Sequence, residues 1–426
     1  MKFLFPLIVW GEDYVDEFLE RSLPTQLAFG NLGDFPWLEG SQYLILTTSE
    51  DRPKIERAPI IRRLRRLMDV QFVDIDDVPR HNKYIGASKA QFEALRHADG
   101  FDAVFFLYPD FLCATGTIQN AARRIAEGWD AVMFPIPAVL ATILEDPAIR
   151  QNEVVTPTPE GKIISIPPRL LVDAANRNYH PMISGYIMGS EKSNLGPAYM
   201  MWEVPDEGYV LRCFHLHPFV IRVQKENPYF LTEFIVSLDE EYVPRLFRSS
   251  ERIYFPSDSD EFAMCSIRAP DSPPQPLDTP IKLTNIVHWA EEYASLVHRE
   301  FVGKCFRWHA QPIEDEAPWE AAEEAGLAVT DLISERLATP DSIIRFEDEV
   351  AFAARARRRH RFRGWRSPVF GTYHVAPPVA PPAPPPAPKG SLLYFLILLK
   401  RATGLGYLRR YPGLLRLWMK VRGDLS

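Results

Sequence analysis

The stretch Asp102-Ala-Val-Phe-Phe-Leu-Tyr-Pro-Asp110 is an apolar run that ends on a carboxylate. It belongs to the fourth unit of a strand-then-helix alternation that begins at residue 2 and continues to residue 135. Short apolar strands separated by helices of roughly ten or more residues predict a parallel sheet with right-handed crossovers. We therefore expect an α/β fold built on a mostly parallel, doubly wound sheet.

Hydrophobic spacing predicts the individual elements. Expected strands lie at 3–10, 43–48, 70–75, 103–107 and 131–135, with expected helices at 14–29, 54–67, 84–97 and 117–127 between them. After residue 136 the pattern changes. Helical spacing covers 137–149, 168–177, 281–312 and 317–338, and strand-like runs cover 208–218 and 252–260. We expect a mixed second half, followed by a helical extension.

Ligands of an open parallel sheet bind beyond the carboxyl ends of its strands. Trp10, Gly11 and Glu12 follow the first expected strand, and Asp110 ends the fourth, so these residues are candidates to hold a nucleotide, a metal or a sugar phosphate. The alternative for Asp110 is a helix cap, because a helix is expected shortly after it. Asn31 is either a helix C-cap or a polar contact to the ligand.

Histidines and acids in the second half are further candidates. His215 and His217 lie two apart in a strand-like run, so both side chains are expected on one face. They are either metal ligands or hydrogen-bonded structural histidines. Asp258 and Asp260 lie in a turn that either binds Mg²⁺ or Mn²⁺ or is only solvated. Asp239 begins an expected helix, where an acid complements the helix dipole.

Charge is distributed unevenly along the chain. The net charge is −8, yet residues 351–426 carry 15 Lys and Arg against one acid, which leaves the first 350 residues strongly acidic. An acidic body argues against nucleic-acid binding by the core, and a basic tail favours an anionic surface. The four cysteines include no C-x-x-C pair, which argues for reduced thiols in a cytoplasmic protein and against a zinc knuckle.

Two common nucleotide motifs are missing from the sequence. No G-x-G-x-x-G follows the first expected strand, and no G-x-x-x-x-G-K-[ST] occurs. Nicotinamide-binding and P-loop folds therefore lack their phosphate-binding residues here. No apolar run reaches the ~18 to 20 residues that are needed to cross a bilayer.

The alternating first half, with an acidic loop after its fourth strand, resembles the GT-A fold of nucleotide-sugar glycosyltransferases, where a metal-binding D-x-D motif occupies that loop. Short sequence words over residues 1–270 are also similar to a poorly described group of bacterial glycosyltransferase-like proteins. These words are Val9-Trp10-Gly11, Gly30-Asn31-Leu32, Tyr108-Pro109-Asp110, Phe214-His215-Leu216-His217-Pro218 and Asp258-Ser-Asp260-Glu261. Tyr108-Pro109-Asp110 retains only the last acid of a D-x-D.

The resemblance implies transfer of a sugar from a nucleotide-diphosphate donor to an acceptor hydroxyl. The residues implied to bind the nucleotide sugar are Trp10, Gly11, Glu12, Asn31 and Asp110. The implied ligands of a Mn²⁺ or Mg²⁺ ion are Asp110, His215 and His217. The implied general base is Asp239 or Asp258. The metal, or basic side chains in its place, would neutralise the leaving diphosphate. The sequence does not indicate whether the transfer inverts or retains the configuration at the anomeric carbon.

Two other classes of function remain open. A metal-dependent hydrolase would use His215, His217, Asp258 and Asp260 as metal ligands, with Asp110 in a structural role. A non-catalytic binding protein would hold a nucleotide or a glycan on the sheet without turnover.

The expected organisation has five parts. They are a nucleotide-binding half (1–136), an acceptor and metal half of the same catalytic domain (137–270), a helical extension (271–350), a basic and Pro/Ala-rich linker (351–390) and a basic amphipathic tail (391–426). Such a tail is expected to lie on an anionic membrane surface, and the alternative is docking on the acidic body. The membrane interpretation predicts a cytoplasmic protein, peripheral on the inner face of the cytoplasmic membrane, with a lipid-linked or envelope glycan as acceptor.

The role of the tail is testable by flotation with anionic liposomes, using the full chain and a truncation to residues 1–375. We expect the full chain to float at low salt and less so at high salt, because headgroup attraction is screened. The truncation should stay in the soluble fraction. A full chain that stays soluble at low salt would show that the tail is not an anchor.

Overall fold

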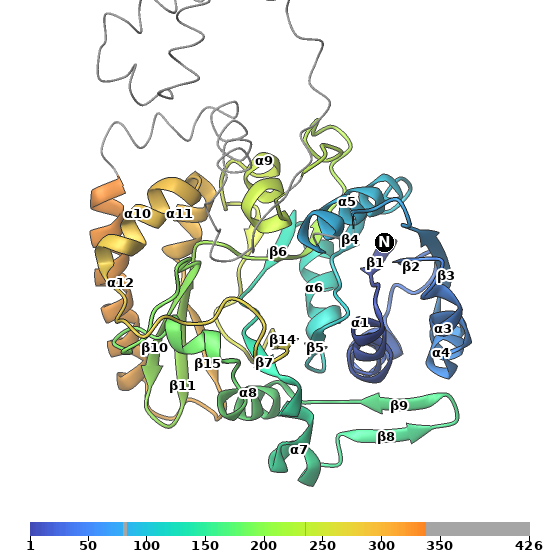
Figure 1. Ribbon diagram of the computed structural model, residues 1–426, viewed down its shortest axis with the longest axis horizontal. Coiled ribbons are helices and arrows are strands. Elements are labelled where there is room, and N and C mark those ends of the chain that lie inside the picture. Colours follow the sequence, from blue (N-terminus) through green and yellow to red (C-terminus); the bar gives the residue numbers. More distant parts are fainter. Residues whose placement is uncertain (80–82, 235, 338–426) are drawn as a thin grey trace, which may run out of the picture. The chain divides into compact units, whose positions relative to one another are not determined.

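The computed structural model describes residues 1–79, 83–234 and 236–337, which belong to one compact unit. The unit contains one large sheet, two three-stranded sheets and a two-stranded hairpin, together with helices (Figure 1). The α/β class expected from the sequence is therefore confirmed. The linker and tail expected at 351–426 lie outside the described residues. Across the described ranges, no helix has both the length and the apolar character needed to cross a bilayer.

The large sheet has the order β13-β6-β12-β4-β1-β2-β3. Its strands are β1 (Phe3–Ile8), β2 (Gln42–Thr47), β3 (Asp69–Asp74), β4 (Ala103–Phe105), β6 (Ala131–Met133), β12 (Pro218–Arg222) and β13 (Ile253–Tyr254). β1 pairs in parallel with β2 and β4, and β2 pairs in parallel with β3. β12 is antiparallel to both β4 and β6. The sheet is thus mostly parallel, as expected, with one reversed strand inside it.

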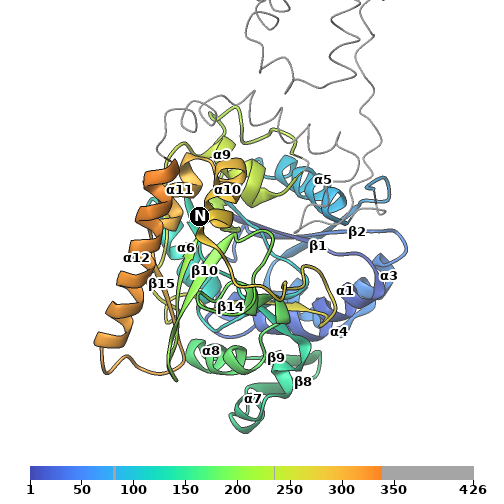
Figure 2. The ribbon, with the colours of Figure 1, turned by 60° about the vertical axis from the view of Figure 1, so that its left-hand side comes forward.

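Helices lead from each parallel strand to the next. They are α1 (Glu12–Glu17), a π-helical turn (Phe18–Ser22) and α2 (Leu23–Gln26), then α3 (Arg52–Arg57) and α4 (Pro59–Leu67), then α5 (Lys83–Arg96), and finally α6 (Thr117–Ala126). α5 covers one face of the sheet, and α1, α3 and α4 lie on the other (Figures 1 and 2). The helix expected at 54–67 is broken because Pro59 disfavours a helical Ala58, whose ψ is 130°.

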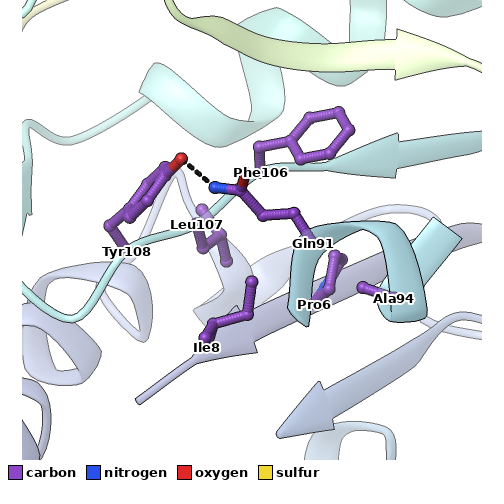
Figure 3. A pocket seen from close by; sticks show the side chains of 7 residues that line it. All are labelled: Pro6, Ile8, Gln91, Ala94, Phe106, Leu107 and Tyr108. Carbon is purple, nitrogen blue, oxygen red and sulfur yellow. Dashed lines mark hydrogen bonds between the residues drawn. The ribbon is translucent and has the colours of Figure 1, made fainter. Parts of the chain in front are cut away.

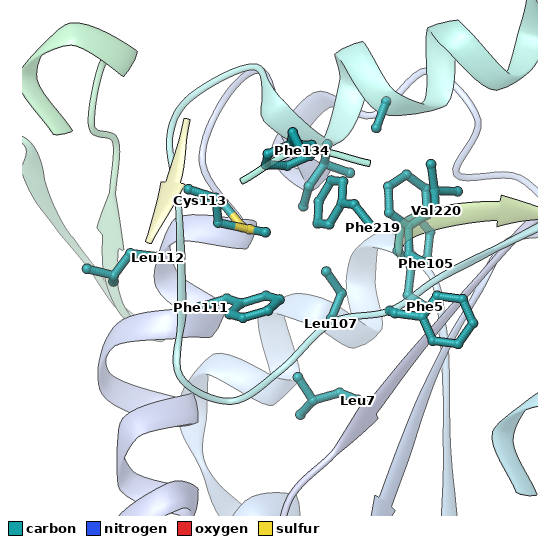
Figure 4. Packing of buried hydrophobic residues seen from close by; sticks show 14 of the residues in the cluster. Phe5, Leu7, Phe105, Leu107, Phe111, Leu112, Cys113, Phe134, Phe219 and Val220 are labelled. Carbon is teal, nitrogen blue, oxygen red and sulfur yellow. The ribbon is translucent and has the colours of Figure 1, made fainter. Parts of the chain in front are cut away.

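A row of phenylalanine rings crosses the large sheet (Figure 4). Phe5 of β1 stacks on Phe105 of β4 with ring centroids 4.7 Å apart. Phe219 of β12 contacts both Phe105 and Phe134 at 5.3 Å, and Phe134 directly follows β6. All four rings are buried, and burial of each contributes about 1.5 to 3 kcal/mol. The row holds the reversed strand between its two neighbours.

The second half is mixed, as expected. One small sheet joins β5 (Phe111–Cys113), β14 (Met264–Arg268) and β7 (Ala138–Leu140), another joins β10 (Tyr199–Val204), β11 (Gly208–Cys213) and β15 (Phe306–His309), and β8 (Val155–Thr158) pairs with β9 (Gly161–Ile164). The helix expected at 137–149 is wrong, because its first part pairs with β14 as β7. Only a 3₁₀ turn (Ala141–Glu145) and α7 (Pro147–Gln151) follow. Strand pairing overrode the local helical pattern.

The remaining elements are mainly helical. They are 3₁₀ turns at Leu32–Asp34 and Pro181–Gly185, a π-helical turn at Leu238–Tyr242, and the helices α8 (Pro168–Arg177), α9 (Val243–Leu246), α10 (Leu283–Tyr293), α11 (Leu296–Val302) and α12 (Ala317–Leu337). α12 packs on β10, β11 and α10 around a second hydrophobic core (Figure 2). The helical pattern expected at 281–312 ends early, because its last part forms β15 against β11.

Asn31 connects α2 to α6. Its buried amide donates to the carbonyls of Thr25 and Ala114, each at 3.0 Å, and its Oδ1 accepts from the backbone N–H of Ile118 at 3.0 Å. Ile118 lies in the first turn of α6, whose own N-cap residue, Gly116, has no side chain to supply a cap. Asn31 therefore caps α6 from another part of the chain. This role replaces the expected C-cap, since α2 is capped at Leu27. The expected contact of Asn31 to a ligand stays a prediction.

Asn31→Ala should lower the free energy of unfolding by about 1 to 3 kcal/mol, because it leaves the buried N–H of Ile118 without its partner. The carbonyls of Thr25 and Ala114 each lose one of two hydrogen bonds, since they also accept from the N–H groups of Ala28 and Thr117. Denaturant titration at fixed pH measures the change. Asn285→Ala, at an exposed position of α10, is the control and should change stability by less than about 0.5 kcal/mol. Equal effects of the two substitutions would contradict the capping role.

Candidate functional site

The strand order reverses between β1 and β4. From β1 the chain adds β2 and β3 on one side, then returns to place β4 on the other side. A bridge between Leu7 and Leu107 brings the ends of the two strands together. Ligands of open α/β sheets bind at such a reversal, outside the carboxyl ends of the strands. The segments 10–12 and 108–110 directly follow these ends.

The reversed strand β12 brings the second half of the chain to the same edge. Its Val220 pairs with Phe105 in antiparallel register, so the start of β12 lies beside the carboxyl end of β4. His217 directly precedes β12. The ring of His217 lies 4.7 Å from the ring of Tyr108, measured between centroids.

His217 is held as a neutral imidazole. Burial lowers its pKa to about 4, against the opposing effect of the nearby Asp239 carboxylate. The ring also forms a hydrogen bond with the backbone of Phe106, and its Nε2 is buried without a partner. Because a carbonyl only accepts, Nδ1 carries the proton and Nε2 presents a lone pair.

The phenol of Tyr108 is influenced by acids from both halves of the chain. The Gln91 amide of α5 donates a hydrogen bond to the Tyr108 hydroxyl (Figure 3). Burial raises the pKa of Tyr108 well above its usual value, and the carboxylates of Asp239 and Asp110 raise this pKa further. We call Tyr108, Asp110, His217 and Asp239 the Tyr108 cluster.

A small hollow lies beside this cluster, between β1, β4 and α5 (Figure 3). Its lining consists of Pro6, Ile8, Gln91, Ala94, Phe106, Leu107 and Tyr108. The hollow is mostly apolar and too narrow to admit a water molecule. A polar ligand at this edge of the sheet would therefore contact the polar residues outside the hollow.

Asp110 contacts β14, and its charge acts on Glu17 of α1. Its Oδ2 accepts a hydrogen bond from the Ser266 hydroxyl at 3.2 Å. Glu17 of α1 has one buried oxygen without a partner. Burial raises the pKa of Glu17, Arg21 opposes this rise, and the Asp110 carboxylate adds to it. Because Asn31 caps α6, the helix-cap alternative for Asp110 is not realised.

Asp239 lies in the π-helical turn at Leu238–Tyr242, next to a buried histidine. The Nε2 of His298 donates to the backbone carbonyl of Asp239 at 2.8 Å, and its Nδ1 accepts from the N–H of Ser295 at 3.2 Å. Burial lowers the pKa of His298 well below its usual value, and His215 lowers it further. A neutral, fully buried ring thus anchors the turn that carries the Asp239 carboxylate.

The end of β1 is tied to the end of β2. Gly11 has a φ of +84°, and its N–H donates to Asp51 Oδ2 at 2.8 Å. The Trp10 ring packs on α5 beside Gly86. The contact is close, because a Cβ at Gly86 would lie only 3.4 Å from the ring. Glu12 is exposed at the start of α1. The sequence analysis missed Asp51, although the rule on strand ends applies to it equally.

The two histidines do not share a strand face. β11 ends at Cys213 and β12 begins at Pro218, and these strands belong to different sheets. His215 forms a hydrogen bond through Nε2 with the carbonyl of Tyr293 at 3.0 Å, and its ring lies 4.4 Å from that of His298. The expected common face is wrong, because the chain must leave one sheet and enter the other between these strands.

Asp258 and Asp260 lie at the opposite end of β14 from Asp110. Asp110 contacts the last part of β14, whereas the two acids precede its first residue. Arg169 of α8 binds both carboxylate oxygens of Asp260, at 2.6 and 2.8 Å. The expected acidic turn is present and is neutralised in part by this arginine.

The metal-ligand sets expected from the sequence are not assembled. Among the residues that the structure describes, one group brings three ligand atoms within 4.8 Å of one another, and it contains Asp258, Asp260 and His309. The set of Asp110 with the two histidines is not such a group, and neither is the hydrolase set. We therefore assign no chemical step to a metal at Asp110.

Comparisons with known proteins give little further information. No family model matches the chain, and no curated protein has a matching sequence. Among solved structures, the mannosyltransferase PcManGT from Pyrobaculum calidifontis, in complex with GDP-Man and Mn²⁺, is similar at a TM-score of 0.33 and 11% identity. The likeness covers 84% of this chain and 86% of that one. A likeness this weak does not by itself assign a fold or an activity.

His217 should make stability depend on pH. Its pKa is lower in the folded than in the unfolded chain, so its contribution is complete above pH ~6.5 and is lost as the pH falls towards ~4. Between pH 7 and pH 4.5 the free energy of unfolding should fall in both proteins. In His217→Gln the fall should be smaller than in the wild type by about 1 to 3 kcal/mol. Denaturant titrations across this range measure the difference.

His288→Gln removes an exposed histidine of α10 and serves as the control, which should follow the wild-type curve. Parallel curves for His217→Gln and wild type would show that His217 is not held neutral.

Proposed function

We propose that the protein is a glycosyltransferase that moves a sugar from a nucleotide-diphosphate donor to an acceptor hydroxyl on a GT-A-like sheet. The observation that carries this proposal is the Tyr108 cluster. Carboxylates from both halves of the chain act on one phenol at the point where the strand order reverses. This is the edge at which open α/β sheets receive nucleotides.

The nucleotide part of the donor would lie at the end of β1. Trp10 offers an aromatic surface there, and Gly11 permits close approach of the backbone because it has no Cβ. Glu12 is exposed beside them. Asp110, across the strand reversal, would accept hydrogen bonds from the sugar hydroxyls, because a carboxylate is a pure acceptor.

Asp239 is the proposed general base. The acceptor oxygen forms a bond to the anomeric carbon while the bond from that carbon to the diphosphate oxygen breaks. The acceptor proton passes to Asp239, and the nucleoside diphosphate leaves. His217 adds no positive charge beside Asp239, because burial keeps the imidazole neutral. Asp258, the other base suggested by the sequence, lies beyond the far end of β14 and has no part in this proposal.

The acceptor in this proposal is a glycan or a lipid-linked glycan of a bacterial envelope. This part rests on the sequence of the C-terminal tail alone. A tail held on an anionic membrane surface would keep the enzyme close to a lipid-linked acceptor.

Two substitutions separate donor binding from chemistry. Asp110→Asn should abolish the rise in melting temperature that a matching UDP-sugar or GDP-sugar produces, because the sugar loses a charged acceptor. Asp239→Asn should keep this rise but lower turnover by about a hundredfold or more, because the base is lost. Asp99→Asn, at an exposed acid before β4, is the control.

Thermal shift over a panel of nucleotide sugars, followed by detection of released nucleoside diphosphate, measures both effects. Donor binding that survives Asp110→Asn unchanged would reject the site. Donor binding without release of diphosphate by the wild type, with any acceptor tried, would indicate a non-catalytic binding protein instead.

A further inference from the structure

The acidic turn at Asp258–Asp260 faces a buried histidine from a distant part of the chain. His309 ends β15, and its side chain is only 4% exposed. Its Nε2 lies 3.9 Å from Asp260 Oδ2, and ligand atoms of His309, Asp258 and Asp260 all lie within 4.8 Å of one another. This group lies apart from the Tyr108 cluster, beyond the other end of β14.

The hydrogen bonds of His309 fix which nitrogen faces the acids. Its Nδ1 lies 2.8 Å from the carbonyl oxygen of Gln311. A carbonyl only accepts, so Nδ1 carries the proton, and in the neutral ring Nε2 presents a lone pair to the two carboxylates. Metal-binding histidines show this arrangement, in which the second nitrogen donates to a backbone carbonyl and orients the ring.

The separation between His309 and Asp260 does not correspond to a hydrogen bond. A charge-assisted contact between imidazolium and carboxylate lies at about 2.7 to 2.9 Å, whereas the two atoms here are 3.9 Å apart. An ion with bonds of about 2.0 to 2.2 Å to nitrogen and oxygen would bridge such a gap. A lone pair aimed at two carboxylates favours a cation between them, because all three groups are electron-rich.

Arg169 supplies part of the positive charge that faces Asp260. Its guanidinium binds both oxygens of Asp260, and this hydrogen bonding lowers the pKa of the Asp260 carboxyl. The Arg169 side chain is half-exposed on α8. It would therefore compete with a metal for Asp260.

We propose that Asp258, Asp260 and His309 form a site for a divalent transition-metal ion of the Zn²⁺ type. One imidazole nitrogen and two carboxylates suit Zn²⁺ or Mn²⁺ better than Mg²⁺, which prefers an octahedral set of oxygens. Water would complete the coordination. The site is independent of the proposed sugar transfer.

The ion would fasten two parts of the fold. The turn before β14 already exchanges backbone hydrogen bonds with β15, from Ser259 to Arg307 at 2.9 Å and from Arg307 to Ser257 at 2.8 Å. β15 belongs to the sheet with β10 and β11, whereas β14 pairs with β5 and β7. A metal at this junction would stabilise the contact between the two small sheets, so its expected effect is on stability.

The test measures thermal unfolding of the full chain with EDTA, Zn²⁺, Mn²⁺ or Mg²⁺, and metal content after dialysis. Zn²⁺ should raise the melting temperature of the wild type, Mn²⁺ less so, and Mg²⁺ little. His309→Gln and Asp258→Asn should each weaken the Zn²⁺ affinity by more than about tenfold. Asp258 is half-buried, whereas His309 is buried, so this variant stays informative if His309→Gln does not fold.

Two further variants sharpen the result. Arg169→Gln should strengthen Zn²⁺ binding, because it removes the competitor for Asp260. His288→Gln is the matched control, since His288 also lies 3.9 Å from a carboxylate, that of Glu291, but its side chain is 83% exposed. This control should keep the full response to Zn²⁺.

Three results would overturn the proposal. One is that Zn²⁺ does not stabilise the wild type, which would indicate that a protonated His309, and not a metal ion, faces the two carboxylates. Another is an equal response to Mg²⁺ and Zn²⁺, which would indicate screening of an acidic turn. The third is a Zn²⁺ response that survives both His309→Gln and Asp258→Asn, which would place the ion elsewhere.

Discussion

The antiparallel strand β12, inserted between β4 and β6, is the constraint on which the rest of the structure depends. Its Phe219 contacts Phe105 of β4 on one side and Phe134, directly after β6, on the other, so buried rings fix the insertion. Because this strand is reversed, the chain that enters it must lie beside the carboxyl end of β4. The second half of the molecule thereby brings His217 next to the loop that carries Asp110.

Burial and charge act together in the Tyr108 cluster. Asp110 and Asp239 come from different halves of the chain, and both raise the pKa of the Tyr108 phenol beyond the effect of burial. Burial of His217 favours the neutral imidazole, although Asp239 nearby favours the charged one. The neutral form prevails because desolvation is the larger effect. The proposed transfer chemistry uses this arrangement, since the neutral imidazole of His217 adds no positive charge beside Asp239.

The two acidic segments that the sequence presents as alternatives differ in their surroundings. Asp110 lies near another carboxyl group, that of Glu17, at the point where the strand order reverses. Asp258 and Asp260 face an arginine and a histidine with a fixed tautomer. The first environment suits hydrogen bonding to a polar ligand, and the second suits a cation. β14 connects the two regions, with one at each end.

The sequence by itself determined the strands β1 to β4, the helices α5, α6, α8 and α12, and the positions of Trp10 and Asp110 at strand ends. Apolar periodicity and helix breakers act over a few residues, and parallel pairing then brings those strand ends to one edge. Only the tertiary structure decided that Asn31 caps α6 at Ile118, 87 residues away, and that His309 faces Asp260. It also decided the reversal of β12 and the strand β7. Each of these features depends on partners distant in the chain, and local sequence patterns carry no information about which distant groups become buried together.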